Sequence, residues 1–385
     1  MSPRRDALAA ARGRELSDVV AERHVIVCTG AGGVGKTTTA AALALGAAAL
    51  GRRTIVITID PARRLAQSLG LTALGNTPHR VAGVDGLDAM MLDMKRTFDE
   101  VIDRHAPDPT RAEAIKSNRF YQQLSDSLAG TQEYMAMEKL YDLHETGRYD
   151  CIVIDTPPTR SALDFLDAPK RLTDFLEGRF LRMFLGPGMH VGRAFGRAAA
   201  FGTGLFMRAA SRITGATVLE DLGSFFQSFE GMYEGFKTRA AAVYRLLQSR
   251  TAAFVVVSSP EGPALREARY FLQRLASDGM PTAGLVLNRT TPPPPEGITA
   301  DADELARAVT RLRDDDSVEA RTAAALLSLH ADRVAVVERE RRNVAAALRG
   351  VDPRAVVDVP ELPDDVHDLD GLRAVGAYLY RLPVA

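Results

Sequence analysis

Short apolar runs alternate with longer amphipathic stretches along most of the chain. The apolar runs are rich in β-branched residues and have no polar side, which is typical of parallel strands that helices cover on both faces. They predict strands at 24–29, 54–59, 89–93, 150–154, 254–257 and 283–287, and a last one at 355–359. The intervals between them predict helices at 37–50, 95–104, 111–145 with a break near Gly130, and 261–277. This alternation indicates an α/β fold with a mostly parallel sheet and helices on both faces.

Two regions depart from the alternation. Residues 169–215 separate two predicted strands and are rich in Phe, Met, Gly and Arg, whereas residues 300–350 are helical in pattern and heavily charged. We expect residues 1–22 to form a polar, partly helical lead-in, and residues 23–385 to form one domain. Within that domain we expect a helical insertion at about 169–250 and a helical C-terminal segment at about 300–385.

The run from Gly30 to Thr39 carries the most specific motif of the chain. It reads G-A-G-G-V-G-K-T-T-T and fits the pattern G-x-x-x-x-G-K-[ST], between a predicted strand and a predicted helix. In that setting the backbone N–H groups of a glycine-rich loop turn inward around a phosphate. Lys36 then reaches the β- and γ-phosphates, and the Thr37 hydroxyl is a ligand for magnesium. The residues expected to hold a nucleotide here are Gly30, Gly32, Gly33, Val34, Gly35, Lys36, Thr37 and Thr38.

Two aspartates follow predicted strands and are candidates for the chemistry. Asp60 stands before Pro61, so it either orients the water that attacks the γ-phosphate or caps a helix. Asp155 follows four apolar residues, so it either lies near magnesium, through a water, or acts as a cap. The phosphate-loop motif favours the catalytic interpretation of both. Lys36, Asp60 and Asp155 are therefore the candidate catalytic residues.

The composition excludes several classes of protein. Of 385 residues, 46% are hydrophobic and 25% charged, and the net charge of −1 gives no field that would favour nucleic acid. Cys28 and Cys151 lie in apolar runs and form no C-x-x-C pair, so we expect reduced thiols and no zinc site. No run reaches the roughly 18 apolar residues that span a bilayer, and residues 1–22 do not look like a signal peptide. We therefore expect a cytoplasmic protein without an integral membrane segment.

Taken together, these motifs resemble those of the ArsA-like ATPases. That family includes arsenite-pump ATPases and the ATPases that target tail-anchored membrane proteins, and the likeness covers most of the chain. Asp60-Pro61-Ala62 resembles the family's first switch, D-P-A, and Asp155 to Thr159 (D-T-P-P-T) resembles its second, D-T-A-P-T. Ala129 to Glu133 is similar to its P-G-x-x-E segment, with Ala129 in place of the proline.

The resemblance implies a phosphate-loop ATPase fold that uses ATP and Mg²⁺, with Thr37 and, through a water, Asp155 at the metal. It also implies where adenine binds. Leu287-Asn288-Arg289 resembles the strand end whose asparagine reads the base, and the segment from Pro360 to Leu372 resembles the tail that closes over it. The expected adenine contacts are Asn288, Arg289 and Pro360.

Ala31 departs from the family pattern. The family's dimers hold ATP between subunits, and a signature lysine at this position reaches across to the partner's phosphates. With Ala31 in its place, three alternatives remain open: a homodimer that hydrolyses ATP slowly, a heterodimer with a paralogous ATPase that supplies the charge, or another basic residue that supplies it. The cysteine pairs that bind zinc or arsenite in some relatives are also absent, which disfavours a metal-stapled dimer and metalloid sensing.

The insertion contains two apolar runs, Phe180 to Leu185 and Ala200 to Met207. Arginines interrupt this region at spacings suited to one face of a helix, namely Arg182, Arg193, Arg197 and Arg208. In the family the corresponding insertion forms a groove for a hydrophobic client helix. Client binding or peripheral membrane contact is thus one interpretation, and packing on the protein's own sheet or its dimer mate is the other.

The sequence therefore predicts a Mg-dependent ATPase that couples ATP binding and hydrolysis to dimer closure and to the binding of a hydrophobic client. Three alternatives remain. The chain could be a regulatory or scaffold ATPase that acts with a paralogue, or the energising subunit of an anion efflux system. It could also be a positioning ATPase of the ParA/MinD type, which is less favoured because residues 377–383 contain only one basic side chain.

Overall fold

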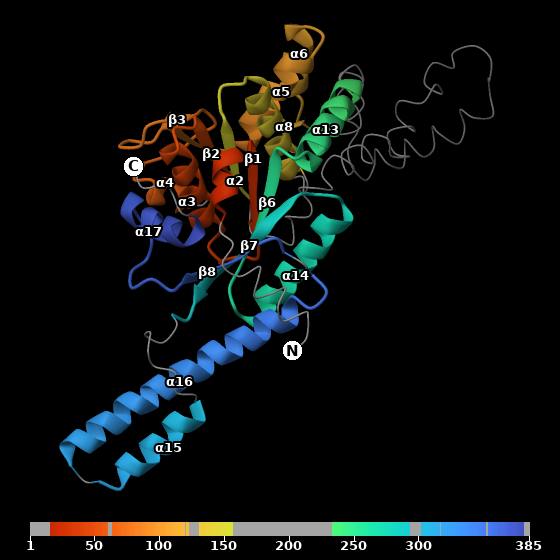
Figure 1. Ribbon diagram of the computed structural model, residues 1–385. Helices are drawn as coiled ribbons and strands as arrows, with labels where there is room; N and C mark the ends of the chain where they lie inside the picture. The colour runs from red at the N-terminus through yellow and green to blue at the C-terminus, as the bar shows by residue number, and fades with distance from the viewer. Residues whose placement is uncertain are drawn as a thin grey trace, which may run out of the picture.

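The computed structural model describes residues 16–60, 64–119, 121–122, 131–156, 233–292, 302–315, 317–351 and 353–380. These residues form one eight-stranded sheet with helices on both faces, as Figure 1 shows. The predicted α/β fold is thereby confirmed. The central strands β1, β2, β5 and β6 are buried on both faces because their apolar side chains lie between two layers of helices.

The sheet has the strand order β3-β4-β2-β5-β1-β6-β7-β8. All neighbours pair in parallel except β3, which runs antiparallel to β4. β1, β2 and β5 are adjacent, so their carboxyl ends meet at one place on the edge of the sheet. The strands span Val25–Gly30 (β1), Thr54–Thr58 (β2), His79–Arg80 (β3), Leu87–Met91 (β4), Cys151–Asp155 (β5), Ala252–Ser258 (β6), Thr282–Thr290 (β7) and Val356–Pro360 (β8).

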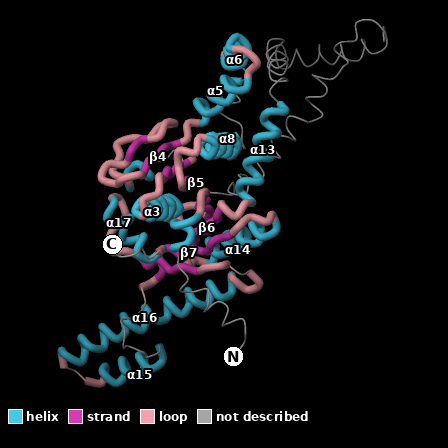
Figure 2. The backbone as a smooth tube through the Cα atoms, turned by 45° about the horizontal axis from the view of Figure 1, so that its top comes forward, coloured by secondary structure: helices cyan, strands magenta, loops and turns pink. Residues whose placement is uncertain are grey.

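Two hydrophobic cores lie on opposite faces of the sheet. One contains buried residues of α5, α8, α13 and α14, and the other contains those of α2, α3, α4 and α17. Figures 1 and 2 both show α17 beside α3. The helices span Ser17–Glu22 (α2), Lys36–Ala49 (α3), Arg64–Ser68 (α4), Met94–His105 (α5), Pro109–Lys116 (α6), Thr131–Glu145 (α8), Tyr233–Gln248 (α13), Gly262–Ser277 (α14), Ala302–Arg313 (α15), Val318–Ala347 (α16) and Leu369–Leu379 (α17).

The observed boundaries differ from the predicted ones by two or more residues at β4, β6 and β7, and β3 was not predicted; β6 was predicted at 254–257 and spans Ala252–Ser258. The helix predicted at 111–145 is also broken at 117–118, because α6 ends at Lys116. β4 was predicted at 89–93 but ends at Met91, because the Asp93 side chain caps α5 by accepting from Arg96 N–H at 2.9 Å. β7 was predicted at 283–287 and extends to Thr290. β3 was not predicted, because it has only two residues and both are exposed.

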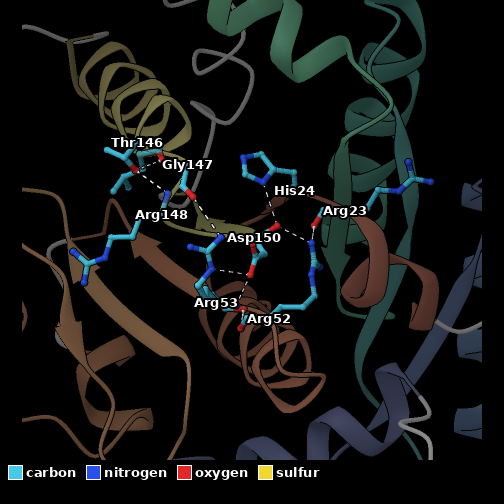
Figure 3. Close-up of polar contacts among 10 residues, drawn as sticks. Arg23, His24, Arg52, Arg53, Thr146, Gly147, Arg148 and Asp150 are labelled. Carbon is cyan, nitrogen blue, oxygen red and sulfur yellow. Dashed lines mark hydrogen bonds and ion pairs between the residues drawn. The ribbon is translucent and has the colours of Figure 1, made fainter.

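A polar cluster ties the amino-terminal ends of the three central strands together, as Figure 3 shows. The Arg53 guanidinium pairs with the Asp150 carboxylate at 2.6 Å, and Arg52 Nη2 donates to the Asp150 carbonyl at 2.7 Å. His24 Nδ1 lies 3.1 Å from the same carbonyl. These contacts fix the starts of β1, β2 and β5 relative to one another, and therefore also the alignment of their carboxyl ends.

Helices α15 and α16 form a hairpin that projects from the sheet, as Figures 1 and 2 both show. α16 has 30 residues, which corresponds to a length of about 45 Å. Its C-terminal half lies against the ends of β7 and β8, whereas its N-terminal half packs on α15.

The insertion expected at about 169–250 is described only from Tyr233 onward, where α13 begins. The apolar runs at 180–185 and 200–207, with their four arginines, lie outside the described residues. Among the helices that the structure does describe, none is long and apolar enough to cross a bilayer.

Candidate functional site

The loop between β1 and α3 has the backbone that its glycines predict. Gly30, Gly33 and Gly35 have φ values of 153°, 74° and 96°. A Cβ at Gly30 would overlap the backbone carbonyl of Val257 in β6, and a Cβ at Gly35 would overlap the Asn288 side chain. Gly35 also precedes the first turn of α3 and offers no side-chain cap, which leaves that helix N-terminus suited to an anion.

Lys36 is held inside this loop. Its side chain is only 6% exposed, and Nζ donates to the Ala31 carbonyl at 2.7 Å. Burial lowers the pKa of Lys36, while the nearby Asp155 and Asp60 carboxylates oppose that shift. The cation therefore lies where the motif predicts a phosphate contact, bound to a carbonyl oxygen of the loop itself.

Asp155 lies at the centre of the site and is fully buried. Its Oδ2 accepts hydrogen bonds from Thr37 Oγ1 at 2.8 Å and from Thr58 Oγ1 at 2.9 Å. Burial raises the pKa of Asp155 to about 6, although the two hydroxyl donors and Lys36 favour its charged form. The structure thus brings together three of the predicted residues, Lys36, Thr37 and Asp155.

The second oxygen of this carboxylate fits a magnesium ion. Asp155 Oδ1 is buried and has no hydrogen-bond donor among the described residues. An unsatisfied carboxylate oxygen beside the Thr37 hydroxyl offers the hard oxygen atoms that Mg²⁺ prefers. No group of three His, Cys, Asp or Glu side chains suited to a metal lies in the part of the chain that the structure describes, so the remaining ligands would come from phosphate oxygens and water.

Asp60 lies two residues beyond the end of β2, at the same edge of the sheet. Its backbone N–H donates to Thr58 Oγ1 at 3.2 Å, and its side chain is partly buried. Thr58 pairs with Asp155 in the β2–β5 register, so its hydroxyl contacts both predicted aspartates. The two residues that complete the first switch motif, Pro61 and Ala62, lie outside the described residues.

The segment that resembles the family's second switch begins with a contact to β1. Thr156 Oγ1 donates to the Cys28 carbonyl at 2.8 Å, and the Ile59 N–H donates to the Asp155 carbonyl at 3.2 Å. The segments that leave β2 and β5 are thereby tied to each other and to β1. Residues 157–159 of the motif, and Ala129 and Gly130 of the P-G-x-x-E-like segment, lie outside the described residues.

Asn288 and Arg289 contact the phosphate loop directly. Asn288 Nδ2 donates to the Val34 carbonyl at 2.9 Å, and the Arg289 guanidinium donates to the Gly33 carbonyl. Arg289 has a φ of 57°, the one positive value at a non-glycine residue within the described ranges. The β7–β8 register shifts at the same point, so a bulge turns this strand end toward the loop.

Pro360 lies one strand farther out and faces a different space. It pairs with Thr290 at the end of β8 and lines a cavity of about 270 Å³ between the sheet and α16. Asn288 is not among the residues that line this cavity. Glu340 of α16 anchors its wall, because its carboxylate accepts from Thr291 N–H at 3.0 Å and from Thr291 Oγ1 at 2.8 Å. The lining residues are Pro260, Leu287, Thr290, Thr291, Val337, Glu340, Arg341, Val344, Asp358, Pro360 and Tyr378.

Sequence reasoning missed the contact of Thr58 with Asp155 and that of Glu340 with Thr291. Thr58 belongs to no motif, and it meets Asp155 only because β2 and β5 are neighbours in the sheet. A threonine at a strand end two residues before Asp60 was the available signal. Glu340 lies in a charged run that looks like a solvated helix face, and nothing local distinguishes it from its neighbours.

Comparison with known proteins identifies the family. The profile of the anion-transporting ATPases matches residues 23–307. The chain is 29% identical over 270 residues to "ATPase GET3" of Malassezia globosa, covering 70% of this chain and 73% of that protein. It is 26% identical over 265 residues to "ATPase get3" of Schizosaccharomyces pombe, covering 68% and 71%.

A shorter match joins these two. "ATPase ASNA1 homolog 1" of Paramecium tetraurelia is 34% identical over 140 residues, which is 36% of this chain and 42% of that protein. Three observations point to the same family: the fold, the phosphate loop with its buried lysine and aspartate, and these relatives. The chain belongs to the anion-transporting, or ArsA-like, ATPase family, and it is an ATP hydrolase.

Proposed function

We propose that this protein is a cytoplasmic, Mg-dependent ATPase that couples its nucleotide state to the closing and opening of a dimer and to the binding of a hydrophobic client. One observation carries the proposal. The buried Asp155 carboxylate joins the Thr37 hydroxyl of the phosphate loop to Thr58 at the end of β2. A change at the phosphates therefore reaches both segments that resemble the family's switches.

Each residue of the site has one task in this proposal. Lys36 and the backbone N–H groups from Gly32 to Thr38 bind the phosphates, and Asp60 orients the attacking water. Thr37 and, through a water, Asp155 would hold magnesium, which when bound neutralises charge on the phosphates. Asn288 and Arg289 donate to carbonyl oxygens of the phosphate loop, which supports a role for both side chains beside a nucleotide bound there. The adenine contacts proposed are Asn288, Arg289 and Pro360.

The coupling to a partner and a client rests on likeness. ATPases that target tail-anchored membrane proteins hold a hydrophobic helix, and the relatives named above are GET3 and ASNA1 proteins. Thr58 is hydrogen-bonded to both Asp155 and the Asp60 N–H. These bonds support a site in which the segment after β2 and the segment after β5 move together. We place the client surface in the insertion at about 169–250.

Two variants test this function. Lys36→Ala is expected to lower the ATP hydrolysis rate by at least about 10²-fold, because the phosphates lose their fixed cation. Asp60→Asn is expected to bind ATP and to turn it over about 10²-fold more slowly, because the water loses its orienting carboxylate. Lys95→Ala on the exposed face of α5 is the matched control and is expected to hydrolyse ATP normally. Wild-type turnover in Lys36→Ala would contradict the assigned site.

The client is tested with a labelled peptide of about 20 apolar residues, the length of a membrane-spanning helix. Asp60→Asn held with ATP and Mg²⁺ is expected to retain the peptide, and Lys36→Ala is expected to lose it. Equal retention by both variants would show that peptide binding does not follow the nucleotide, and would remove the coupling from the proposal.

A second candidate is a heteromer with a paralogous ATPase, and Ala31 favours it. This residue is 9% exposed and has no charge to offer a partner, while its carbonyl is already bound by Lys36. A paralogue with a lysine at the corresponding position would supply the missing cation across the interface.

A further inference from the structure

One face of α16 is exposed along the half of the helix that projects from the sheet. Val318, Leu326 and Leu329 are 66%, 64% and 69% exposed, the highest values among the large apolar side chains of the described residues. At about 100° per residue, the three lie within an arc of about 80°. Apolar side chains gathered on one helix face mark a binding surface, because a monomer gains nothing from keeping them in water.

The opposite side of the same segment is covered by α15. Ala320 and Ala324 of α16 are buried there, as are Leu305 and Val309 of α15. The hairpin therefore has a core of its own and does not need the Val318 face for its stability.

The exposed face has the spacing of a helix-pairing seam. Val318, Thr322, Ala325, Leu329 and Val336 follow one another at intervals of four, three, four and seven residues, and the exposed Asp332 occupies the position that the last interval passes over. Apolar or small side chains at such positions pack against a second helix. The seam ends near the sheet, where the α16 residues beyond it line the cavity beside β8.

Charges beside the seam make it complementary to itself. An antiparallel pairing that sets Ala325 opposite the partner subunit's Leu329 also sets Glu319 opposite the partner subunit's Arg333. A two-fold axis between the two chains repeats both contacts. It also brings Leu326 against Leu326 of the partner subunit. Within one chain Glu319 and Arg333 are 14 positions apart on one helix, about 21 Å, so they cannot pair with each other.

We propose that the α16 face from Val318 to Val336 is a self-association surface, on which a second copy of this chain packs antiparallel. The two α16 helices then form the centre of a four-helix bundle, with the two α15 helices outside. Each sheet is attached to the C-terminal half of its own α16, so the two nucleotide sites lie at opposite ends of the bundle. This interface goes beyond the ATP-gated dimer proposed above, and it forms without nucleotide.

Two charge variants and their mixture test the pairing by sedimentation velocity without ATP. Glu319→Arg alone and Arg333→Glu alone each create two like-charge contacts, and each is expected to weaken self-association by about tenfold or more. An equimolar mixture restores both opposite-charge contacts, so it is expected to associate as the wild-type chain does. No structural change within one chain can produce this rescue, even though Arg333→Glu also loses the bond from Arg333 Nε to the Pro292 carbonyl.

Arg339→Glu is the matched control, because it changes an exposed charge on α16 outside the paired segment. It is expected to leave self-association unchanged. Leu326→Glu is expected to abolish association while circular dichroism shows the wild-type helix content. A wild-type chain that stays monomeric without ATP at about 100 µM would overturn the proposal. So would an equimolar mixture that associates no better than its components.

Discussion

Asp155 acquires its properties from residues that are distant in the sequence. Its own strand buries it, which raises its pKa to about 6 by desolvation. Hydroxyl donors from α3 and β2 favour the ionised form, and Lys36 adds a positive charge. Desolvation favours the neutral acid, whereas the two hydroxyls and Lys36 favour the charged carboxylate. Together they allow a carboxylate at a position that water does not reach. Removing one hydroxyl therefore alters the site with little change in its shape.

Thr58→Val is expected to lower kcat for ATP hydrolysis by about tenfold or more. The hydroxyl donates to Asp155 at 2.9 Å and accepts from the Asp60 N–H at 3.2 Å, so its loss disturbs both aspartates. A hydrogen bond to a charged group is worth about 1.5–3 kcal/mol, which corresponds to a factor of about ten or more. Steady-state kinetics with saturating ATP and Mg²⁺ measures the change.

Thr54→Val at the other end of β2 is the control for that variant. Its hydroxyl donates only locally, to the Arg52 carbonyl at 3.0 Å, and the residue is fully buried. We expect Thr54→Val to lose a buried hydroxyl, as Thr58→Val does, and to keep the wild-type kcat. Equal kcat values in the two variants would mean that the Thr58 hydroxyl does not position the aspartates.

The site residues that sequence predicts are those that belong to a local motif. Lys36 and Thr37 follow from the loop motif, and the structure places both beside Asp155. Thr58 could not be predicted in the same way, because its contact with Asp155 depends on β5 lying between β2 and β1. Strand order is a property of the whole sheet, and one sequence does not contain it in any local pattern.

At the scale of elements, α3 and α17 are locked together by one tyrosine. The Tyr380 ring follows α17 and lies between two glycines, Gly46 of α3 and Gly376 of α17. Its hydroxyl donates to the Ala42 carbonyl at 2.9 Å. Because burial raises the pKa of Tyr380 to about 12, the hydroxyl stays neutral and remains a donor at physiological pH.

Gly46→Ala is expected to lower the free energy of unfolding by about 1–2 kcal/mol. Alanine gains up to about 1 kcal/mol of helix propensity, but the new Cβ would lie 2.6 Å from Tyr380 Cε1, and overpacking costs about 1–3 kcal/mol. Gly235→Ala in α13 is the matched control, since its Cβ would meet His105 Nδ1 at an ordinary 3.5 Å. Urea unfolding compares the two, and a stabilised Gly46→Ala would show that the ring moves aside freely.

Periodicity predicted the long elements well and the short ones poorly. α14 was expected at 261–277 and spans Gly262–Ser277, because its apolar positions repeat at helical spacing and pack on the sheet. β3 has only two residues and both are exposed, so it produces no hydrophobic pattern in the sequence. The hairpin of α15 and α16 was predicted as helical, yet its projection from the sheet could not be, since it follows from the contacts that α16 makes near β8.

At the scale of the whole molecule, a histidine pair at the amino-terminal end of the sheet makes stability depend on pH. His24 Nε2 lies 2.8 Å from His144 Nδ1 of α8. Burial lowers the pKa of His24 below its usual 6.5, and His144 and Arg52 add to this, while the bond to the Asp150 carbonyl opposes it. Below pH 6.5 the unfolded chain therefore takes up a proton that the folded chain does not, so the free energy of unfolding falls with falling pH.

His24→Gln is expected to reduce that fall between pH 6.5 and the lowered pKa of the folded state. It will not abolish it, because burial also lowers the pKa of His105, which has the same sign of effect. Urea unfolding at a series of pH values measures the slope, and His367→Gln in an exposed loop is the control. If the free energy of unfolding of His24→Gln changes with pH as steeply as that of the wild-type chain, the pH dependence comes from other groups.

Whether copies of this chain with Ala31 cooperate in hydrolysis is tested with a designed mixture of variants. In an ATP-closed homodimer, Ala31→Lys would present a cation to the partner's phosphates, and a cation supplied across an interface is worth about 10³–10⁵-fold in rate. The double variant Ala31→Lys/Lys36→Ala cannot hydrolyse ATP at its own site but still carries the new lysine. Adding it to the wild-type chain is therefore expected to raise wild-type turnover, more strongly at higher protein concentration.

The single variant Lys36→Ala, added in the same amount, is the control. It carries no lysine at position 31 and is expected to give no increase. If the two additions have the same effect, this chain does not close on its own copy across ATP, and the missing charge comes from a paralogous partner or from another basic residue.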